Sequence, residues 1–209
     1  RSTPCSTLFP YTTLFRSGYD LCRRCKMDQR TSHIPVILLT AYTNSKRKKE
    51  GFAAGADDYI TKPFNPEMLK LRINNLLKTR KKLQDQFGKM VYSQPKNIPI
   101  SSPDEEFLKK ILDTVENYIS DTGFTVDDLS YQVGLSRAQL YRKMKALFSH
   151  SPSTFIRNYR LERGMQLLEN GHTPSQVCYQ VGFRDPSYFT KCFKKKYGKT
   201  PQQVLKDAK

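Results

Sequence analysis

Two segments of the sequence decide the fold: TVDDLSYQVGLSRAQLYRKMKALFSHSP (Thr125–Pro152) and TPSQVCYQVGFRDPSYFTKCFKKKYGKTP (Thr173–Pro201). Both contain the run YQVG, at Tyr131–Gly134 and again at Tyr179–Gly182, 48 positions later. After one inserted residue the register becomes 49, as Pro152 and Pro201 show. Each segment predicts a short helix, a turn with glycine in the left-handed conformation, and a second helix. The sequence therefore predicts two helix-turn-helix units, although such helix pairs also occur in plain helical bundles.

The charge of the chain favours a polyanionic partner. Its 209 residues carry 36 Lys and Arg against 19 Asp and Glu, a net charge of +17. From Thr125 onward there are fifteen basic and six acidic residues. The mean hydropathy is −0.65, and the longest apolar run, Ile34–Leu39, is far too short to span a bilayer. The charge thus favours nucleic acid, and less often an anionic membrane, with a merely solvated basic surface as the alternative. Together with the helix-turn-helix units, it leads us to expect double-stranded DNA as the partner and no membrane contact.

Start signals predict seven helices from Pro103 to the end. A hydroxyl or carboxylate residue, often followed by Pro, satisfies the free N–H groups of a helix start. These residues are Ser102, Thr125, Ser136, Ser151, Thr173, Asp185 and Thr200. Helical spacing then assigns the core residues, which are Leu140, Met144 and Leu147 in the first unit, Phe189 and Phe193 in the second, and Phe155, Ile156, Tyr159 and Leu168 on a connecting helix, Pro152–Glu169.

The second helix of each unit has an opposite, polar face that we expect to bind DNA. Arg142 lies near a helix start, and arginine reads the edge of guanine with two hydrogen bonds. If both helices read one face of the duplex, they enter major-groove segments about 34 Å apart. Lys195 and Lys196 are either phosphate contacts or solvated charge. The expected DNA-binding residues are Ser136, Arg137, Ala138, Tyr141, Arg142 and Lys145, followed by Arg184, Pro186, Ser187, Thr190, Lys191 and Lys194.

The N-terminal part has a different pattern, in which helices and strands alternate. Helical stretches are expected at 19–27, 45–54 and 65–86, with Met68, Leu69, Ile73, Leu76 and Leu77 on one side of the last. The apolar run Ile34–Leu39 predicts a strand buried on both faces, and Asp58–Thr61 predicts a second strand. This alternation indicates a parallel α/β layer. A Pro- and Ser-rich stretch follows it and predicts a linker over 85–103.

Residues 104–209 resemble an AraC-type DNA-binding domain over essentially its full length. The run YFTKCFKKKYGKTP (Tyr188–Pro201) is similar to the C-terminal signature of that family. The resemblance implies a mainly α, seven-helix fold with two helix-turn-helix motifs. It also implies that Ala138, Tyr141 and Arg142, and in the second unit Pro186, Ser187, Thr190 and Lys191, occupy base-reading positions.

Residues 18–84 resemble the C-terminal half of a response-regulator receiver domain, which is an α/β, flavodoxin-like fold. HIPVILLTA (His33–Ala41) and GADDYITKPFN (Gly55–Asn65) carry the resemblance. It implies that Thr40 is the switch hydroxyl, Tyr59 the aromatic switch and Lys62 the phosphate-pairing lysine. The phosphoacceptor and the acidic Mg²⁺-binding pair of that family belong to strands before Gly18. We therefore expect no phosphoacceptor here, and Mg²⁺ only in an intact receiver. Asp57 and Asp58 lie at the wrong strand end to replace the missing acids.

Residues 1–17 are expected to be an artefact without structure. The run STLFPYTTLFRS, residues 6–17, is the translation of a widely used sequencing adapter. We expect that it replaces whatever precedes Gly18 in the natural gene, so that the natural protein is either a stand-alone regulator or the tail of a hybrid sensor kinase.

The combined pattern predicts a sequence-specific transcription regulator that is the output of a two-component phosphorelay. We expect an activator that works in the reducing cytosol with RNA polymerase, a sensor kinase as input, and a possible homodimer. The alternatives are a signalling receiver as the main role, non-specific coating of nucleic acid, or a fragment of an AraC-linked DNA-repair enzyme. Such an enzyme needs a zinc-held cysteine cluster, whereas Cys22 and Cys25 form a lone C-x-x-C pair. No catalytic residue, metal site or cofactor is expected.

Overall fold

The computed structural model describes residues 17–41, 45–93 and 102–207. The expectation for residues 1–16 lies outside this range. Ser17, the last residue of the expected artefact, is described. It caps the first helix by accepting a hydrogen bond from Asp20 N. The chain divides into two compact units, Arg1–Arg80 and Lys81–Lys209, each of which we describe by itself.

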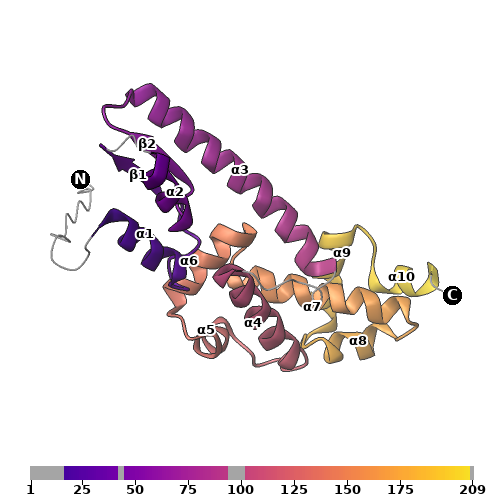
Figure 1. Cartoon of the computed structure of the whole chain (residues 1–209). Helices are drawn as coiled ribbons and strands as arrows, with labels where there is room; N and C mark the ends of the chain where they lie inside the picture. The colour runs from indigo at the N-terminus through magenta and orange to yellow at the C-terminus, as the bar shows by residue number, and fades with distance from the viewer. Residues whose placement is uncertain (1–16, 42–44, 94–101, 208–209) are drawn as a thin grey trace, which may run out of the picture. The chain divides into compact units, whose positions relative to one another are not determined.

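The first unit is a small α/β layer with one parallel strand pair (Figure 1). Its sheet pairs Ile37 with Asp58 and Thr40 with Thr61. The elements in chain order are α1 (Gly18–Met27), β1 (Ile37–Thr40), α2 (Ser45–Ala53), β2 (Asp58–Thr61) and α3 (Pro66–Ser93), the last of which continues into the second unit. The order of elements agrees with the expected alternation of helix and strand.

Two details of this unit differ from the expectation. The strand does not include Ile34, whose side chain is 46% exposed, and Leu39 within it is 41% exposed. The expectation of a strand buried on both faces is therefore wrong, because a sheet of two described strands offers too little cover. Helix α3 continues through Ser93 into the expected linker, and Met68, Ile73 and Leu77 on its apolar side are 51%, 40% and 54% exposed.

The second unit contains the seven expected helices. They are α4 (Pro103–Asn117), α5 (Val126–Val133), α6 (Arg137–Phe148), α7 (Pro152–Glu169), α8 (Pro174–Gln180), α9 (Pro186–Tyr197) and α10 (Pro201–Asp207). The side chains of Ser102, Thr125, Ser136, Ser151, Thr173 and Asp185 accept a backbone N–H at the helix starts, and Thr200 does the same for Gln203. The sequence signals for helix starts are confirmed.

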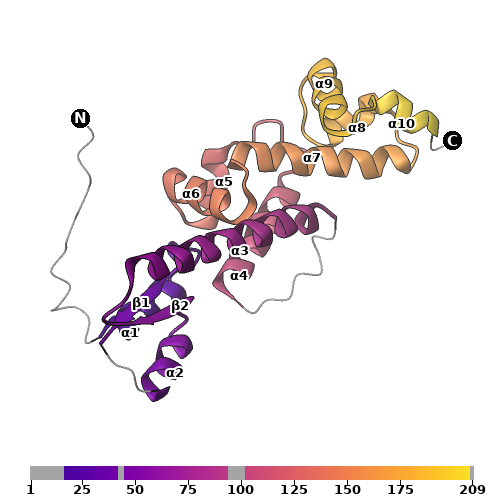
Figure 2. The same ribbon diagram turned by 90° about the horizontal axis from the view of Figure 1, so that it is seen from above.

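Helices α4, α5 and α6 lie along one half of the connecting helix α7, and α8, α9 and α10 lie along the other half (Figure 2). Each group encloses an apolar core of its own. The first, here called lobe 1, joins α4, α5, α6 and the first half of α7, which contributes Phe155, Ile156 and Tyr159. The second, lobe 2, joins α8, α9, α10 and the second half of α7, which contributes Leu161 and Leu168. The predicted core of α7 is thus buried, but it is divided between two clusters. Among the described residues no helix is both long and apolar enough to cross a membrane.

Candidate nucleic-acid interface

Helix α6 is held firmly at its N-terminus and along its buried side. Ser136 accepts from the Gln139 backbone, and the Gln139 side chain accepts in return from Ser136 N at 2.9 Å. This reciprocal pair satisfies two N–H groups that the helix leaves free. Leu140 and Met144 are fully buried. The opposite face is therefore fixed in orientation, and Ala138, Tyr141 and Arg142 on it are exposed.

Helix α9 repeats this arrangement at a constant offset. Arg137–Phe148 and Pro186–Tyr197 both have 12 residues, so the two helices match position by position at an offset of 49. Asp185 takes the capping place of Ser136 and accepts from Ser187 N at 2.7 Å. Phe189 and Phe193 take the buried places of Leu140 and Met144. The turns before the two helices also match, since Gly134 and Gly182 both have a φ of 75°.

The structure places the twelve predicted DNA-binding residues on these two helices and their N-terminal turns. Eleven are exposed and Thr190 is half-buried. Arg142 Nε donates to Ala138 O at 3.3 Å, and the Lys145 ammonium lies 5.8 Å from the centre of the Tyr141 ring. Arg137 pairs with Asp127 at 3.2 Å. The predicted residues thus form two polar, largely basic faces, one for each lobe.

Two of the fifteen basic residues that follow Thr125, Lys143 and Lys196, are not part of those faces. Lys143 has no exposed surface, and its Nζ lies 2.9 Å from Asp104 Oδ1 and 4.6 Å from the centre of the Phe107 ring. Lys196 is half-buried and donates to Glu162 Oε2 at 2.6 Å and to Asn158 O at 3.0 Å. Lys196 is therefore an internal partner, whereas Lys195 is exposed. Helical spacing could have predicted the burial of Lys143, because it lies three residues after Leu140 and four before Leu147 and so shares their side of α6.

The hydroxyl groups of buried Tyr159 and half-buried Tyr197 anchor the connecting helix and α9. The Tyr159 hydroxyl donates to Glu116 Oε2 at 2.8 Å, and the Tyr197 hydroxyl donates to Glu162 Oε2 at 2.7 Å. In both cases burial raises the pKa of the phenol above its usual value, and the carboxylate that accepts the hydrogen bond adds to the effect. Sequence reasoning assigned Tyr159 to the core and did not single out Tyr197.

In the first unit, two of the three predicted switch residues, Thr40 and Lys62, lie at the carboxyl end of the strand pair. Thr40 ends β1, and its carbonyl accepts from Lys62 N at 2.6 Å. Tyr59 is 6% exposed within β2, and the side chain of Lys62 is exposed beyond it. The structure thus brings Thr40 and Lys62 together at one sheet end and leaves Tyr59 in the strand interior.

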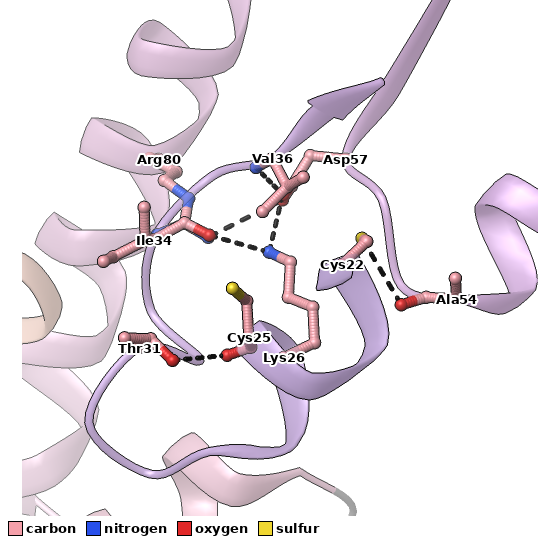
Figure 3. Close-up of polar contacts among 9 residues, drawn as sticks. All are labelled: Cys22, Cys25, Lys26, Thr31, Ile34, Val36, Ala54, Asp57 and Arg80. Atoms are coloured by element: carbon pink, nitrogen blue, oxygen red, sulfur yellow. Dashed lines mark hydrogen bonds and ion pairs between the residues drawn. The ribbon is translucent and has the colours of Figure 1, made fainter. Parts of the chain in front are cut away.

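The opposite sheet end carries the acidic residues. Asp57 Oδ2 accepts from Lys26 Nζ at 2.6 Å and from Val36 N at 2.7 Å, and its Oδ1 lies 3.6 Å from Arg80 Nη2 (Figure 3). Although burial opposes the charge, these hydrogen bonds and cations lower the pKa of Asp57. Asp58 pairs with Arg72 at 3.0 Å. Both carboxylates have structural partners at the end away from Thr40 and Lys62.

The described residues do not fit a bound metal ion. They contain no group of three or more His, Cys, Asp or Glu side chains that could hold one. Asp57 and Asp58 are engaged by lysine and arginine, so they do not form the acidic pair that Mg²⁺ needs in a receiver. Cys22 and Cys25 are free thiols, and burial raises the pKa of Cys22.

Comparison with known families gives each unit a match. Residues 15–74 match the response regulator receiver domain, and residues 111–207 match a helix-turn-helix domain of the AraC type. The chain is a partial receiver domain followed by an AraC-type helix-turn-helix domain. This is the composition of a DNA-binding response regulator that acts on transcription. The two matches are thus of a receiver type and a DNA-binding type.

Individual relatives match different lengths of this chain. Histidine kinase P4 of Formosa agariphila is 46% identical over 187 residues, which are 89% of this chain and 14% of that protein. The transcriptional regulatory protein HptR of Staphylococcus aureus is 26% identical over 83% of this chain and 70% of its own length. The C-terminal domain of the response regulator yesN from Fusobacterium nucleatum is 31% identical, with a TM-score of 0.43 over 46% of this chain and 93% of that one. The chain thus spans only a small part of the Formosa relative.

Proposed function

We propose that α6 and α9 are reading helices that enter successive major-groove segments of one DNA duplex and bind a specific sequence. The observation that supports this most is the matched pair of capped 12-residue helices, each with a buried apolar side and an exposed polar side. Helices of this kind read base edges with residues of their first turns. Two reading helices in one chain would bind two half-sites on one duplex.

Within this proposal the residues have different tasks. Ala138, Tyr141 and Arg142 face the bases of one half-site, and Arg142 supplies the donor pair suited to guanine. Ser187, Thr190 and Lys191 face the other, next to Pro186, whose ring offers only apolar contact. The remaining residues contact phosphates and set the register of the protein on the duplex; they are Ser136, Arg137, Lys145, Arg184 and Lys194.

The wider role follows from the domain order. In the whole protein the receiver takes its input from a sensor kinase, and the DNA-binding domain, working in the cytoplasm as a monomer or homodimer, activates transcription by contacting RNA polymerase. Asp57 and Asp58 pair with Lys26 and Arg72 at the sheet end away from Thr40 and Lys62, which supports the proposal that this chain carries no phosphoacceptor and binds no Mg²⁺. Its own contribution is binding of DNA without catalysis.

Selection of duplexes from a randomised pool by the whole chain tests the proposal. The expected result is enrichment of one motif made of two half-sites separated by about one helical turn. Binding in physiological salt should favour the motif over random DNA by at least about 10³-fold. A pool that stays random while the protein still binds DNA would leave non-specific coating and overturn the proposal.

A further inference from the structure

The border between the two apolar cores falls at one residue, Arg160. Tyr159 belongs to the core of lobe 1 and Leu161 to the core of lobe 2. The two cores are separate clusters, so apolar packing does not by itself fix one lobe against the other. A cavity of about 590 Å³ lies at the same border and is lined by residues of both lobes, among them Thr125, Arg157 and Tyr188.

The Arg160 side chain spans this border. Its Nη2 donates to Asp121 O in the turn between α4 and α5 at 2.5 Å, and its Nη1 donates to Gly182 O in the turn between α8 and α9 at 3.0 Å. Each lobe thus offers one backbone carbonyl to the same guanidinium. Burial lowers the pKa of Arg160, but a guanidinium stays charged in proteins, so both hydrogen bonds are charge-assisted. Arg160 Nε is buried without a hydrogen-bond partner in the described structure, so the two backbone contacts carry the link.

Gly182 is the point of closest backbone approach at this border. A Cβ atom there would lie 2.3 Å from Ile119 O of lobe 1 and 2.8 Å from Arg160 Cζ. Gly134 has the same place in the other helix-turn-helix unit and the same φ of 75°, yet a Cβ there would meet nothing within 4 Å. Backbone conformation explains glycine at both positions. Only at Gly182 does contact between the lobes require it as well.

We propose that the Arg160 bridge and the close approach at Gly182 fix the spacing and rotation of α9 relative to α6, so that they determine which half-site spacing the protein accepts. The effect of this bridge on DNA binding rests on the function proposed above. One added base pair moves a half-site by about 3.4 Å along the duplex and turns it by about a tenth of a helical turn. A pair of lobes held at Gly182 and Arg160 could not follow that change, whereas lobes joined by α7 alone could bend toward it. Arg160 and Gly182 are thus positioning residues, which act on specificity without touching DNA.

The first test measures the lobes without DNA in the full chain. Tyr131 and Tyr179 hold equivalent places in the repeat and are 84% and 53% exposed. Replacing both by p-azidophenylalanine allows spin labels to be attached without using the native cysteines. The distance distribution between the labels should be narrow in this parent and should broaden or shift with Arg160→Met and with Gly182→Ala. Arg163→Met on the same helix removes only an exposed arginine that lies 3.9 Å from Glu116, and this variant and Gly134→Ala should leave the distribution unchanged.

The second test measures binding to the selected motif and to versions with one base pair added or removed between the half-sites. The parent chain should lose roughly tenfold or more in affinity for the altered spacings, comparable to one mismatched base pair. In Arg160→Met the affinities for the original and the altered spacings should differ by no more than about threefold. Arg160→Lys should restore part of the discrimination between spacings, and Arg163→Met should keep all of it. Gly182→Ala should change the preferred spacing more than Gly134→Ala does.

The outcomes separate this proposal from the proposed function. If the parent selects no motif, the proposed function fails, and the label distances still decide whether the bridge holds the lobes. If the parent discriminates spacings but Arg160→Met and Gly182→Ala keep both the ratio and the distances, the bridge has no positioning role. An equal loss of affinity at every spacing for Arg160→Met would also contradict it. If Arg160→Met does not fold, as judged by circular dichroism, the pair Gly182→Ala and Gly134→Ala decides the question.

Discussion

Lys143 lies on α6 among core residues, with its ammonium 2.9 Å from Asp104 at the start of α4. At the matching position of α9, 49 residues later, the chain has Cys192, which is half-buried. Lobe 1 thus joins the first turn of its first helix to the buried side of its reading helix through an ion pair, and lobe 2 does not. A count of basic residues alone assigns Lys143 to the surface and overstates the charge available to DNA.

Substitution of the two members of this ion pair should have different effects on the free energy of unfolding. Asp104→Ala leaves a buried ammonium without its partner and should lower the free energy of unfolding by about 1–3 kcal/mol, less than for a fully buried pair because Asp104 is partly exposed. Lys143→Met removes the charge and keeps the volume, so it should change stability by less than about 1 kcal/mol or increase it. Urea unfolding measures both. Equal destabilisation by the two variants would show that the lysine contributes as a net stabilising charge.

The partly buried hydrogen bond of Tyr197 should make the free energy of unfolding depend on pH in the alkaline range. The folded pKa of this tyrosine is raised above the usual value of about 10, by burial first and then by Glu162, so the folded state keeps a proton that the unfolded chain loses. Its contribution to stability is therefore full below about pH 10 and is lost as pH rises through the folded pKa.

The variant Tyr197→Phe, which lacks the hydroxyl, tests this pH dependence. It should cost about 1.5–3 kcal/mol at pH 8, the range for a hydrogen bond to a charged group. Its free energy of unfolding should then fall less steeply than that of the parent between pH 10 and 11. Urea titrations at several pH values measure this difference, and parallel curves for the two proteins would contradict the assignment.

At the scale of elements, the N-terminal caps position both reading helices. Ser136→Ala removes the acceptor for Gln139 N and should lower stability by about 1 kcal/mol. Ser136→Asp should keep most of it, because Asp185 fills the matching place of α9 and because a carboxylate is favourable at a helix N-terminus. Thermal unfolding followed by circular dichroism compares the two variants. A Ser136→Asp variant as unstable as Ser136→Ala would mean that side-chain capping is not what Ser136 provides.

The helices of the second unit could be predicted from sequence because their start signals are local. Ser151 followed by Pro152, or Thr173 followed by Pro174, needs no tertiary partner to specify a helix start. The first unit could be predicted less well, because the burial of Ile34 or Leu39 depends on strands and covers outside their own segment. The continuation of α3 through Ser93 likewise contradicts a local expectation based on Gly88 and the prolines that follow it.

The two units should differ strongly in local stability. Among the described residues of the first unit, the core cluster consists of the buried residues Cys22, Ala54 and Ala56, and the sheet has one strand pair. Two strands need more cover than this for independent stability. Hydrogen exchange should therefore be fast throughout Gly18–Leu77 and slow in the buried helices α4, α6 and α7. Protection in β1 and β2 equal to that in α7 would contradict this expectation.

At the scale of the whole molecule, the repeat and the charge were enough to predict two basic helical faces, but not the contact between the lobes. The shared run YQVG and the offset of 49 locate both reading helices, since helical spacing fixes which side of each is buried. The bridge from Arg160 to Asp121 and Gly182 joins residues 39 and 22 positions apart through backbone carbonyls, which leave no mark in side-chain patterns. From the sequence, Gly182 could be predicted only as a turn glycine like Gly134, and its contact with the other lobe could not.

The most direct test is to repeat the selection from randomised duplexes with Arg142→Ala and with Lys191→Ala, which occupy matching positions on the two helices. Each variant should lose discrimination at about one base pair of its own half-site, with a cost of roughly 1–3 kcal/mol for the preferred DNA, and should keep the other half-site intact. Arg163→Ala should give the parent motif. A uniform weakening across all sequences for both variants, with no change in either half-site, would contradict the reading of bases by α6 and α9.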